Sequence, residues 1–345
     1  MRIFSYRNKR LARNALIVLG IVLALALIFL IGRLIYLQRF LVYGEDGVRL
    51  DYQQNLQTQG ITDTRPSPEA FPVQMVKPDE SLAVSGPIDD TPKQMSGYYV
   101  TTSMMQNLGK VTEAVEKLEA MPHYMLFEMK SIFGNFYYAS GYFGKYTANV
   151  DVSLISDLRQ QLKDEKVYLI AKVPALSDNN YALDNQSSGL PLSSGALWMD
   201  ENGCYWLDPM DEDVQNYLIA IATELAEEGF DEVVFDGFAI PDSDRIVYES
   251  DFAREEYTAQ AAQAIADNLE GLKIHISFGS ASPLVAPHAD RLYLSGVEGS
   301  AVASTVEGLT DVVSDPAAQI VFLTPSRDTR FEDYSVLRPL IDTEE

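Results

Sequence analysis

The sequence predicts an α/β domain with a parallel sheet, and two observations support this fold class. From residue 97 onward, segments typical of strands alternate with segments typical of helices, which is the pattern of parallel α/β architectures. The run 232–236 contains Val233, Val234 and Phe235 without polar alternation, as expected of a strand buried on both faces. These residues therefore predict a parallel strand, and that strand ends on Asp236.

A helix over residues 213–228 leads into this strand. Acidic residues 211–213 suit the positive end of its dipole, and Gly229 suits its C-terminal end. Its apolar residues recur at the three- and four-residue spacing of a helix with one buried face: Val214, Tyr217, Leu218, Ile221, Ala222, Leu225 and Ala226. Asp236 then lies at the carboxyl end of the strand, where parallel α/β folds place their chemistry. An aspartate at a strand end also commonly caps the next turn, so both roles remain open.

The other elements of the domain follow the same alternation. Runs of β-branched and aromatic residues predict further strands at 97–101, 124–129, 167–173, 273–278, 291–295 and 319–324. Apolar residues at helical spacing predict helices at 111–120, 152–162, 252–269, 302–313 and 334–341. Together with 232–236, this reading contains seven clear strands.

Residues 1–37 predict a membrane anchor. Residues 1–14 form a basic tail with five basic and no acidic residues, and residues 15–32 carry no charge. The apolar segment 15–37, interrupted by Arg33, is long enough to span a bilayer as a helix. The positive-inside rule places its N-terminus in the cytoplasm. A cleaved signal peptide would have a shorter apolar region and a small-residue cleavage site, so we expect a single-pass cell-membrane protein with an extracellular C-terminal domain.

Residues 38–95 predict an extracellular linker between this anchor and the domain at 96–345. The linker segment is polar and contains six prolines, a composition that disfavours a packed core. Within it, residues 48–52 could pair as a short strand.

The exported part of the chain is strongly acidic. The formal charge is −24, and beyond Phe40 the sequence has 19 basic and 50 acidic residues, a charge of −31. Such a surface disfavours nucleic acid and suits a neutral polymer or a cationic partner. The single cysteine, Cys204, excludes an intrachain disulfide framework, which fits a Gram-positive bacterial surface. The sequence has no metal-ligand spacing, phosphate loop or serine-hydrolase motif, so we expect no metal and no cofactor.

The run GALWMDENGCYWLDPMDEDVQNYLIAIATELAEEGFDEVVFDGFAIP, which starts at Gly195, resembles a family of predicted glycoside hydrolases of unknown substrate. The matching positions are Trp198, Asp200, Asn202, Gly203, Trp206, Asp208, Pro209, Gly229, Phe230, Asp231, Phe235, Asp236 and Pro241. This resemblance implies a TIM-barrel-like (β/α)8 fold, distantly similar to the alpha-amylase clan. A closed barrel needs eight strands, so either one strand lies in a segment that reads as a loop, or closure is incomplete.

The resemblance also implies site residues. Hydrolysis of a glycosidic bond usually needs two carboxylates; Asp236 matches the strand-end nucleophile, and Glu128 is the best available acid. Glu128 has an alternative role in a strand-end ion pair, and Glu298 is a weaker candidate. The implied substrate-binding positions are Lys130, Trp198, Asp200, Trp206 and Asp208. The aromatic residues of the loops could bind sugar rings or pack the loops onto the barrel, and packing is favoured for Trp206.

Three departures from the family pattern affect the same face of the barrel. The segment HISFGSAS lacks the acidic residue expected near the end of the fifth strand, Ala239 replaces an arginine, and SGVEGS replaces an aromatic-rich motif. The sequence therefore predicts a membrane-anchored extracellular protein, similar to glycoside hydrolases, that acts on or binds a polysaccharide or cell-wall glycan. The alternative is a catalytically inactive barrel that serves as a carbohydrate- or protein-binding scaffold.

Overall fold

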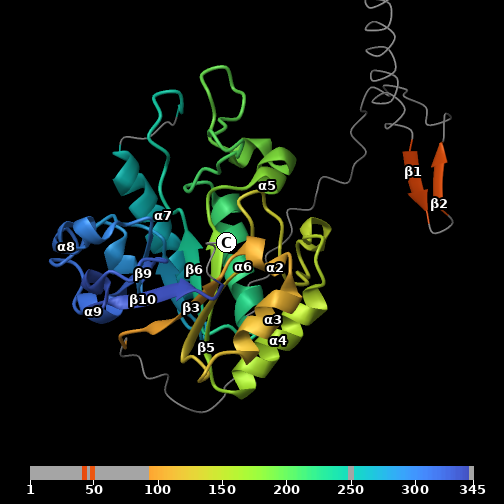
Figure 1. Ribbon diagram of the computed structural model, residues 1–345. Helices are drawn as coiled ribbons and strands as arrows, with labels where there is room; N and C mark the ends of the chain where they lie inside the picture. Colours follow the sequence, from red (N-terminus) through yellow and green to blue (C-terminus); the bar gives the residue numbers. More distant parts are fainter. Residues whose placement is uncertain (1–40, 45–46, 51–92, 248–251, 342–345) are drawn as a thin grey trace, which may run out of the picture. The chain divides into compact units, whose positions relative to one another are not determined.

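The computed structural model describes residues 41–44, 47–50, 93–247 and 252–341 (Figure 1). The expected membrane helix at 15–37 and most of the expected linker lie outside these residues. Within the described ranges, no helix combines the length and the apolar character needed to cross a bilayer. Strands β1 (Leu41–Gly44) and β2 (Gly47–Leu50) form an antiparallel pair in a first unit, and β2 overlaps the short strand expected at 48–52.

The second unit contains a closed barrel of eight parallel strands. In spatial order around the barrel these are β3 (Ser96–Val100), β4 (Tyr124–Glu128), β5 (Tyr168–Pro174), β6 (Glu232–Asp236), β7 (His275–Phe278), β8 (Leu292–Ser295), β9 (Ile320–Leu323) and β10 (Ser335–Pro339). Each strand pairs in parallel with the next, and β10 pairs with β3 to close the ring. The fold class expected from the sequence is thus confirmed for the domain.

Helices surround the strands on the outside (Figure 1). They are α2 (Thr102–Met105), α3 (Leu108–Glu116), α4 (Val152–Asp164), α5 (Asn179–Asp184), α6 (Glu212–Glu227), α7 (Arg254–Leu269), α8 (Val302–Glu307) and α9 (Pro316–Gln319). The main core packs the apolar faces of α3, α4, α6 and α7 against the outer face of the strands. Gly229 follows α6 with a φ of +89°, the left-handed conformation that ends a helix and favours glycine.

The structure corrects the prediction of a final helix at 334–341, because these residues contain the eighth strand, β10. Both faces of this short strand are buried: Leu337 joins the cluster inside the barrel, and Val336 joins a cluster outside it. A short apolar run buried on both faces has no strand periodicity, which explains the wrong prediction. Pro339 would also have disfavoured a helix interior. The helix predicted at 302–313 is shorter than expected and ends at Glu307, next to Gly308.

The interior of the barrel has an apolar middle and polar ends. The apolar cluster consists of Met95, Leu126, Ile170, Val234, Tyr293, Val321, Leu323 and Leu337. At the N-terminal end of the strands, Glu232 forms a buried ion pair of 2.7 Å with Arg291 and accepts hydrogen bonds from Ser277 and Tyr168. The opposite end, where the strands finish, carries the residues of the candidate site.

Candidate functional site

Three charged side chains meet at the carboxyl ends of adjacent strands. Glu128 ends β4 and Asp236 ends β6, while Lys172 lies on β5 between them. The Nζ atom of Lys172 is 3.0 Å from Oε1 of Glu128 and 2.9 Å from Oδ2 of Asp236. The exposed fractions of the side chains are 21% for Glu128, 28% for Asp236 and 11% for Lys172. The two carboxylates therefore remain accessible at the mouth of the barrel, while the lysine is nearly buried.

The shared ammonium limits how far apart the carboxylates can be. Because one oxygen of each lies within 3.0 Å of the same nitrogen, these oxygens are at most about 6 Å apart, close to the ~5–5.5 Å typical of retaining glycosidases. The structure thus brings together the two catalytic candidates that the sequence suggested, Glu128 and Asp236. Both carboxylates also form ion pairs with Lys172 at the strand ends, which is the alternative role that the sequence suggested for Glu128.

Lys172 is held in its charged form. Burial alone would lower the pKa of Lys172, but the neighbouring carboxylates of Asp236 and Glu128 more than offset this effect, and the pKa is raised above its usual value. Sequence reasoning did not select Lys172. The signal that could have found it is a single charged residue within the otherwise apolar run VYLIAKV, because a lysine in a doubly buried strand requires a partner.

Glu128 has a second fixed partner on the neighbouring element. Its Oε2 accepts a hydrogen bond of 2.8 Å from the backbone N–H of Thr102, at the start of α2. Both carboxylate oxygens of Glu128 therefore act as acceptors, the arrangement expected of an ionised carboxylate. On β3, half-buried Tyr99 adds a phenol whose pKa is raised, chiefly by burial, with Lys172 lowering and Glu128 raising it.

Gly279 lies in the segment HISFGSAS, which departs from the family pattern. A Cβ atom at this position, just after β7, would lie 2.4 Å from Oδ1 of Asp236 and 2.8 Å from its Cα. Any larger side chain would therefore displace Asp236. The segment HISFGSAS carries no second carboxylate here, and its glycine leaves the space that Asp236 occupies.

Lys130, for which the resemblance implies a substrate-binding role, lies in the segment that follows β4. Its side chain has no exposed surface and forms a 3.0 Å ion pair with Asp178. The ammonium also donates a hydrogen bond of 2.6 Å to the carbonyl oxygen of Pro174, and Asp178 accepts one of 2.7 Å from Tyr217. Lys130 and Asp178 thus connect the segment after β4, the loop after β5 and α6, and the substrate-binding role of Lys130 stays a prediction.

Trp198, Asp200 and Trp206 are brought together with one another in the long loop after β5. The indole N–H of Trp206 donates a hydrogen bond of 3.0 Å to Asp200, whose other oxygen accepts from two backbone N–H groups. Burial raises the pKa of Asp200, but these hydrogen bonds outweigh it and the pKa is lowered. Trp198 is 8% exposed and packs in a cluster with Ile240. Trp198 therefore packs within this cluster, and its role in substrate binding stays a prediction.

Asp208 lies just before α6 and is held by two hydrogen bonds. It accepts from the backbone N–H of Met210 at 3.0 Å and from the hydroxyl of Tyr257 at 3.3 Å. Burial raises the pKa of its carboxyl group. These contacts fix the start of α6, so they give Asp208 a structural position.

The loop after β4 combines buried and exposed aromatic residues. Tyr138 is buried and donates a hydrogen bond of 2.9 Å to Glu224 of α6. By contrast, Phe133 is 43% exposed and Tyr142 is 68% exposed. The exposed rings could contact a ligand, whereas the buried ones pack the loop. Glu298 is an exposed residue of the loop after β8. Among the described residues, no cluster of three His, Cys, Asp or Glu side chains is arranged to hold a metal ion.

Solved structures with a similar fold include two alpha-galactosidases. The enzyme from Lactobacillus brevis aligns with a TM-score of 0.51 at 9% identity, over 74% of this chain and 38% of the enzyme. A second enzyme, from Geobacillus stearothermophilus in complex with raffinose, aligns with a TM-score of 0.50 at 14% identity, over 76% and 40%. At these identities the likeness shows the fold alone, and this chain spans less than half the length of either enzyme. Comparison with curated proteins returns no match.

Membership of a family rests on the sequence itself. A family model described as "Putative glycosyl hydrolase domain" matches residues 97–280, which is more than half of the 345-residue chain. This segment runs from β3 to just beyond β7 and includes Glu128, Lys172 and Asp236. The chain therefore belongs to this glycosyl hydrolase-like family.

Proposed function

We propose that this protein is a membrane-anchored glycoside hydrolase that acts on a neutral or cationic glycan outside the cell. The observation that carries the proposal is the pair of partly exposed carboxylates, Glu128 and Asp236, at the mouth of the barrel. Enzymes with this fold place their active sites at that end. The charge of −31 beyond Phe40 favours neutral or cationic substrates over anionic ones.

The short separation of the two carboxylates favours a retaining mechanism. Asp236 would attack the anomeric carbon and form a glycosyl ester as the bond to the leaving oxygen breaks. Glu128 would give its proton to that oxygen, and would later take a proton from the water that hydrolyses the ester. Glu128 can carry this proton only after it separates from Lys172, so substrate binding must break that ion pair.

A specific observation favours a second function, glycan binding without cleavage. Lys172 pairs with both Glu128 and Asp236, which leaves neither carboxylate free to act as an acid in the resting site. A barrel that lost its chemistry could retain such a site as a scaffold at the cell surface. The two functions differ in turnover rather than in binding.

Asp236→Asn separates these two functions. The purified protein would be incubated with a panel of neutral and amino-sugar polysaccharides, and both binding and the release of reducing ends would be measured. An enzyme should lose at least about 1,000-fold in rate in this variant while still binding the glycan, because a catalytic carboxylate acts mainly in the transition state. Asp242→Asn, which removes the same charge from a fully exposed side chain, should keep its activity. Absence of turnover in the wild-type protein with every glycan that it binds would favour the scaffold.

The proposed location has its own test. We propose that residues 1–14 are cytoplasmic, that 15–37 span the membrane, and that 38–95 connect the anchor to the extracellular domain. Protease added to intact cells should then remove the barrel domain, detected with an antibody against it. Full protection of the domain in intact cells, together with cleavage in lysed cells, would contradict this topology.

A further inference from the structure

Tyr99 lies on the inner side of the barrel, close to Glu128. It is the second-to-last residue of β3 and pairs in register with Leu126 of β4. Its side chain packs against the interior cluster that contains Leu126. Glu128 follows Leu126 by two residues, and side chains two apart on a strand project from the same face. Glu128 is therefore the inward-facing neighbour of Tyr99 that lies one step nearer the mouth.

The exposed part of Tyr99 faces the mouth of the barrel. Tyr99 is partly exposed, whereas Leu126 and Leu337 of the same cluster are completely buried. Because the apolar middle of the barrel is closed, an inward-facing side chain near the carboxyl end of β3 reaches solvent at that end. Lys172 lowers and Glu128 raises the pKa of the Tyr99 phenol, so the hydroxyl group lies within range of both charges.

Tyr99 offers a ligand two kinds of contact. Its ring has an apolar face that suits the C–H face of a sugar, and its hydroxyl can donate to or accept from a sugar hydroxyl. Burial is the largest effect on the pKa of this phenol and raises it, so the hydroxyl keeps its proton at neutral pH. The oxygens of Glu128 accept from Lys172 and from the backbone N–H of Thr102, so this carboxylate is compensated without Tyr99.

We infer that Tyr99 is a substrate-binding residue of the mouth, where it holds one sugar ring of the glycan beside Glu128. The inference rests on the proposed function, because it assigns a further residue to the same site. The ring of Tyr99 packs against the sugar, and its hydroxyl bonds to a hydroxyl of that sugar. This contact is made before the reaction as well as in the transition state, so it contributes to affinity rather than to the rate of the chemical step.

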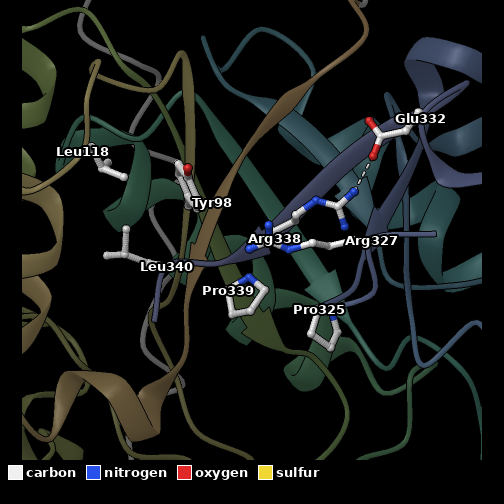
Figure 2. Close-up of a pocket in the computed structure, with 8 residues that line it drawn as sticks. All are labelled: Tyr98, Leu118, Pro325, Arg327, Glu332, Arg338, Pro339 and Leu340. Carbon is white, nitrogen blue, oxygen red and sulfur yellow. Dashed lines mark hydrogen bonds and ion pairs between the residues drawn. The ribbon is translucent and has the colours of Figure 1, made fainter. Parts of the chain in front are cut away.

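Tyr98, the preceding residue, provides a matched control. It packs against the main core outside the strands and lines a pocket together with Leu118 and Leu340 (Figure 2). The two tyrosines therefore lie on opposite faces of β3, and the same hydroxyl group can be removed at either position. A sugar bound at the mouth should respond to the change at Tyr99 and not to the change at Tyr98.

The probes are D-glucose, D-galactose, D-mannose and D-glucosamine. Their binding to the full-length protein would be measured by ligand-observed NMR titration, in a detergent without a sugar headgroup. Tyr99→Phe should weaken the tightest of the four about three- to tenfold, the effect of losing one hydrogen bond, and Tyr98→Phe should leave its affinity unchanged. Tyr99→Ala should weaken it further, because the ring is also lost. With any glycan that is hydrolysed, Tyr99→Phe should raise KM by the same factor and change kcat by less than about twofold.

Unchanged affinity in Tyr99→Phe, or no binding of any of the four sugars, overturns the inference. An equal loss in Tyr98→Phe also overturns it, since the sugar would then occupy the pocket of Figure 2. The proposed function is judged separately, by polysaccharide turnover and by Asp236→Asn. Turnover that is unaffected by Tyr99→Phe would leave the hydrolase standing and reject this role of Tyr99. Sugar binding that depends on Tyr99, without turnover of any glycan, would support the role in a scaffold.

Discussion

Replacing Lys172 with methionine would remove the cation that Glu128 and Asp236 share. The two carboxylates would remain at most about 6 Å apart, and at an effective dielectric constant of about 20 their repulsion is roughly 3 kcal/mol. Removing one partner of a buried ion pair costs a similar ~3–5 kcal/mol. We therefore expect Lys172→Met to lower the free energy of unfolding of the barrel by about 3 kcal/mol at pH 8. For a domain of this size the melting temperature would fall by about 6–12 °C.

The assay is denaturant unfolding followed by tryptophan fluorescence. Both tryptophans of the chain, Trp198 and Trp206, lie in the barrel domain, so the signal reports on this domain even in the full-length protein. The double variant Lys172→Met/Asp236→Asn should regain most of the lost stability, because it removes one of the repelling carboxylates. As a control, Lys117→Met breaks an ion pair whose side chains are 72% and 59% exposed, and such surface pairs contribute less than about 1 kcal/mol.

The pH dependence provides a further check on Lys172. The pKa of Lys172 is raised in the folded protein. The stability that Lys172 adds to the fold is therefore complete below the usual lysine pKa of about 10.4 and is lost as pH rises through the raised pKa. The stability difference between wild type and Lys172→Met should therefore be constant from about pH 8 to pH 10. A loss below about 1 kcal/mol for Lys172→Met, or a double variant no more stable than the single one, would refute this account of the site.

Three other predictions concern stability and use the same fluorescence assay. Glu232→Gln should cost about 3–5 kcal/mol, because it leaves Arg291, whose side chain is 6% exposed, without its charge partner; a cost near zero would show that the pair is not needed. The hydrogen bond to Asp290 raises the pKa of His275. The stability that protonated His275 adds to the fold is therefore complete below about pH 6.5 and is lost as pH rises through the raised pKa. Asp290→Asn should therefore flatten the pH dependence of the melting temperature between about pH 6 and pH 8, and an unchanged slope would argue against this pair. Leu337→Ala should cost about 2–5 kcal/mol because Leu337 is fully buried inside the barrel, whereas a negligible cost would contradict β10 as a closing strand.

Most of the barrel could be predicted from local sequence patterns. The strand expected at 232–236 has the same bounds as β6, and the seven expected strands all correspond to strands of the barrel. The eighth strand could not be recognised in the same way, because its place depends on pairing with residues 96–99 at the other end of the domain. A local pattern does not contain that long-range pairing, so a run of five residues buried on both faces could equally be read as part of a helix.

The candidate site was predictable in part, from strand ends and from the family resemblance. Asp236 was suggested by its place at the end of a buried strand and by the resemblance, and Glu128 by the resemblance and its place near a strand end. Lys172 was not found, because it lies two residues before the end of β5 and its importance depends on partners from two other strands. The resemblance implied a substrate-binding role for Trp198, and the sequence did not reveal that Trp198 packs against Ile240 in the loop after β6, a contact between segments about forty residues apart.

Two ionic networks of the described residues lie at the two ends of the barrel, and their solvent exposure indicates which one can bind a ligand. In the first network, at the N-terminal end of the strands, Glu232 is completely buried. Its carboxylate already has protein partners, because it pairs with Arg291 and accepts a hydrogen bond from Ser277. A carboxylate and a guanidinium balance each other there, and any ligand would have to displace protein contacts inside a packed barrel. In the second, two partly exposed carboxylates share one ammonium, which leaves one negative charge in excess at an open end. An excess charge near water can be compensated by a cationic or hydroxyl-rich ligand at little structural cost, so function is to be sought at Glu128, Lys172 and Asp236.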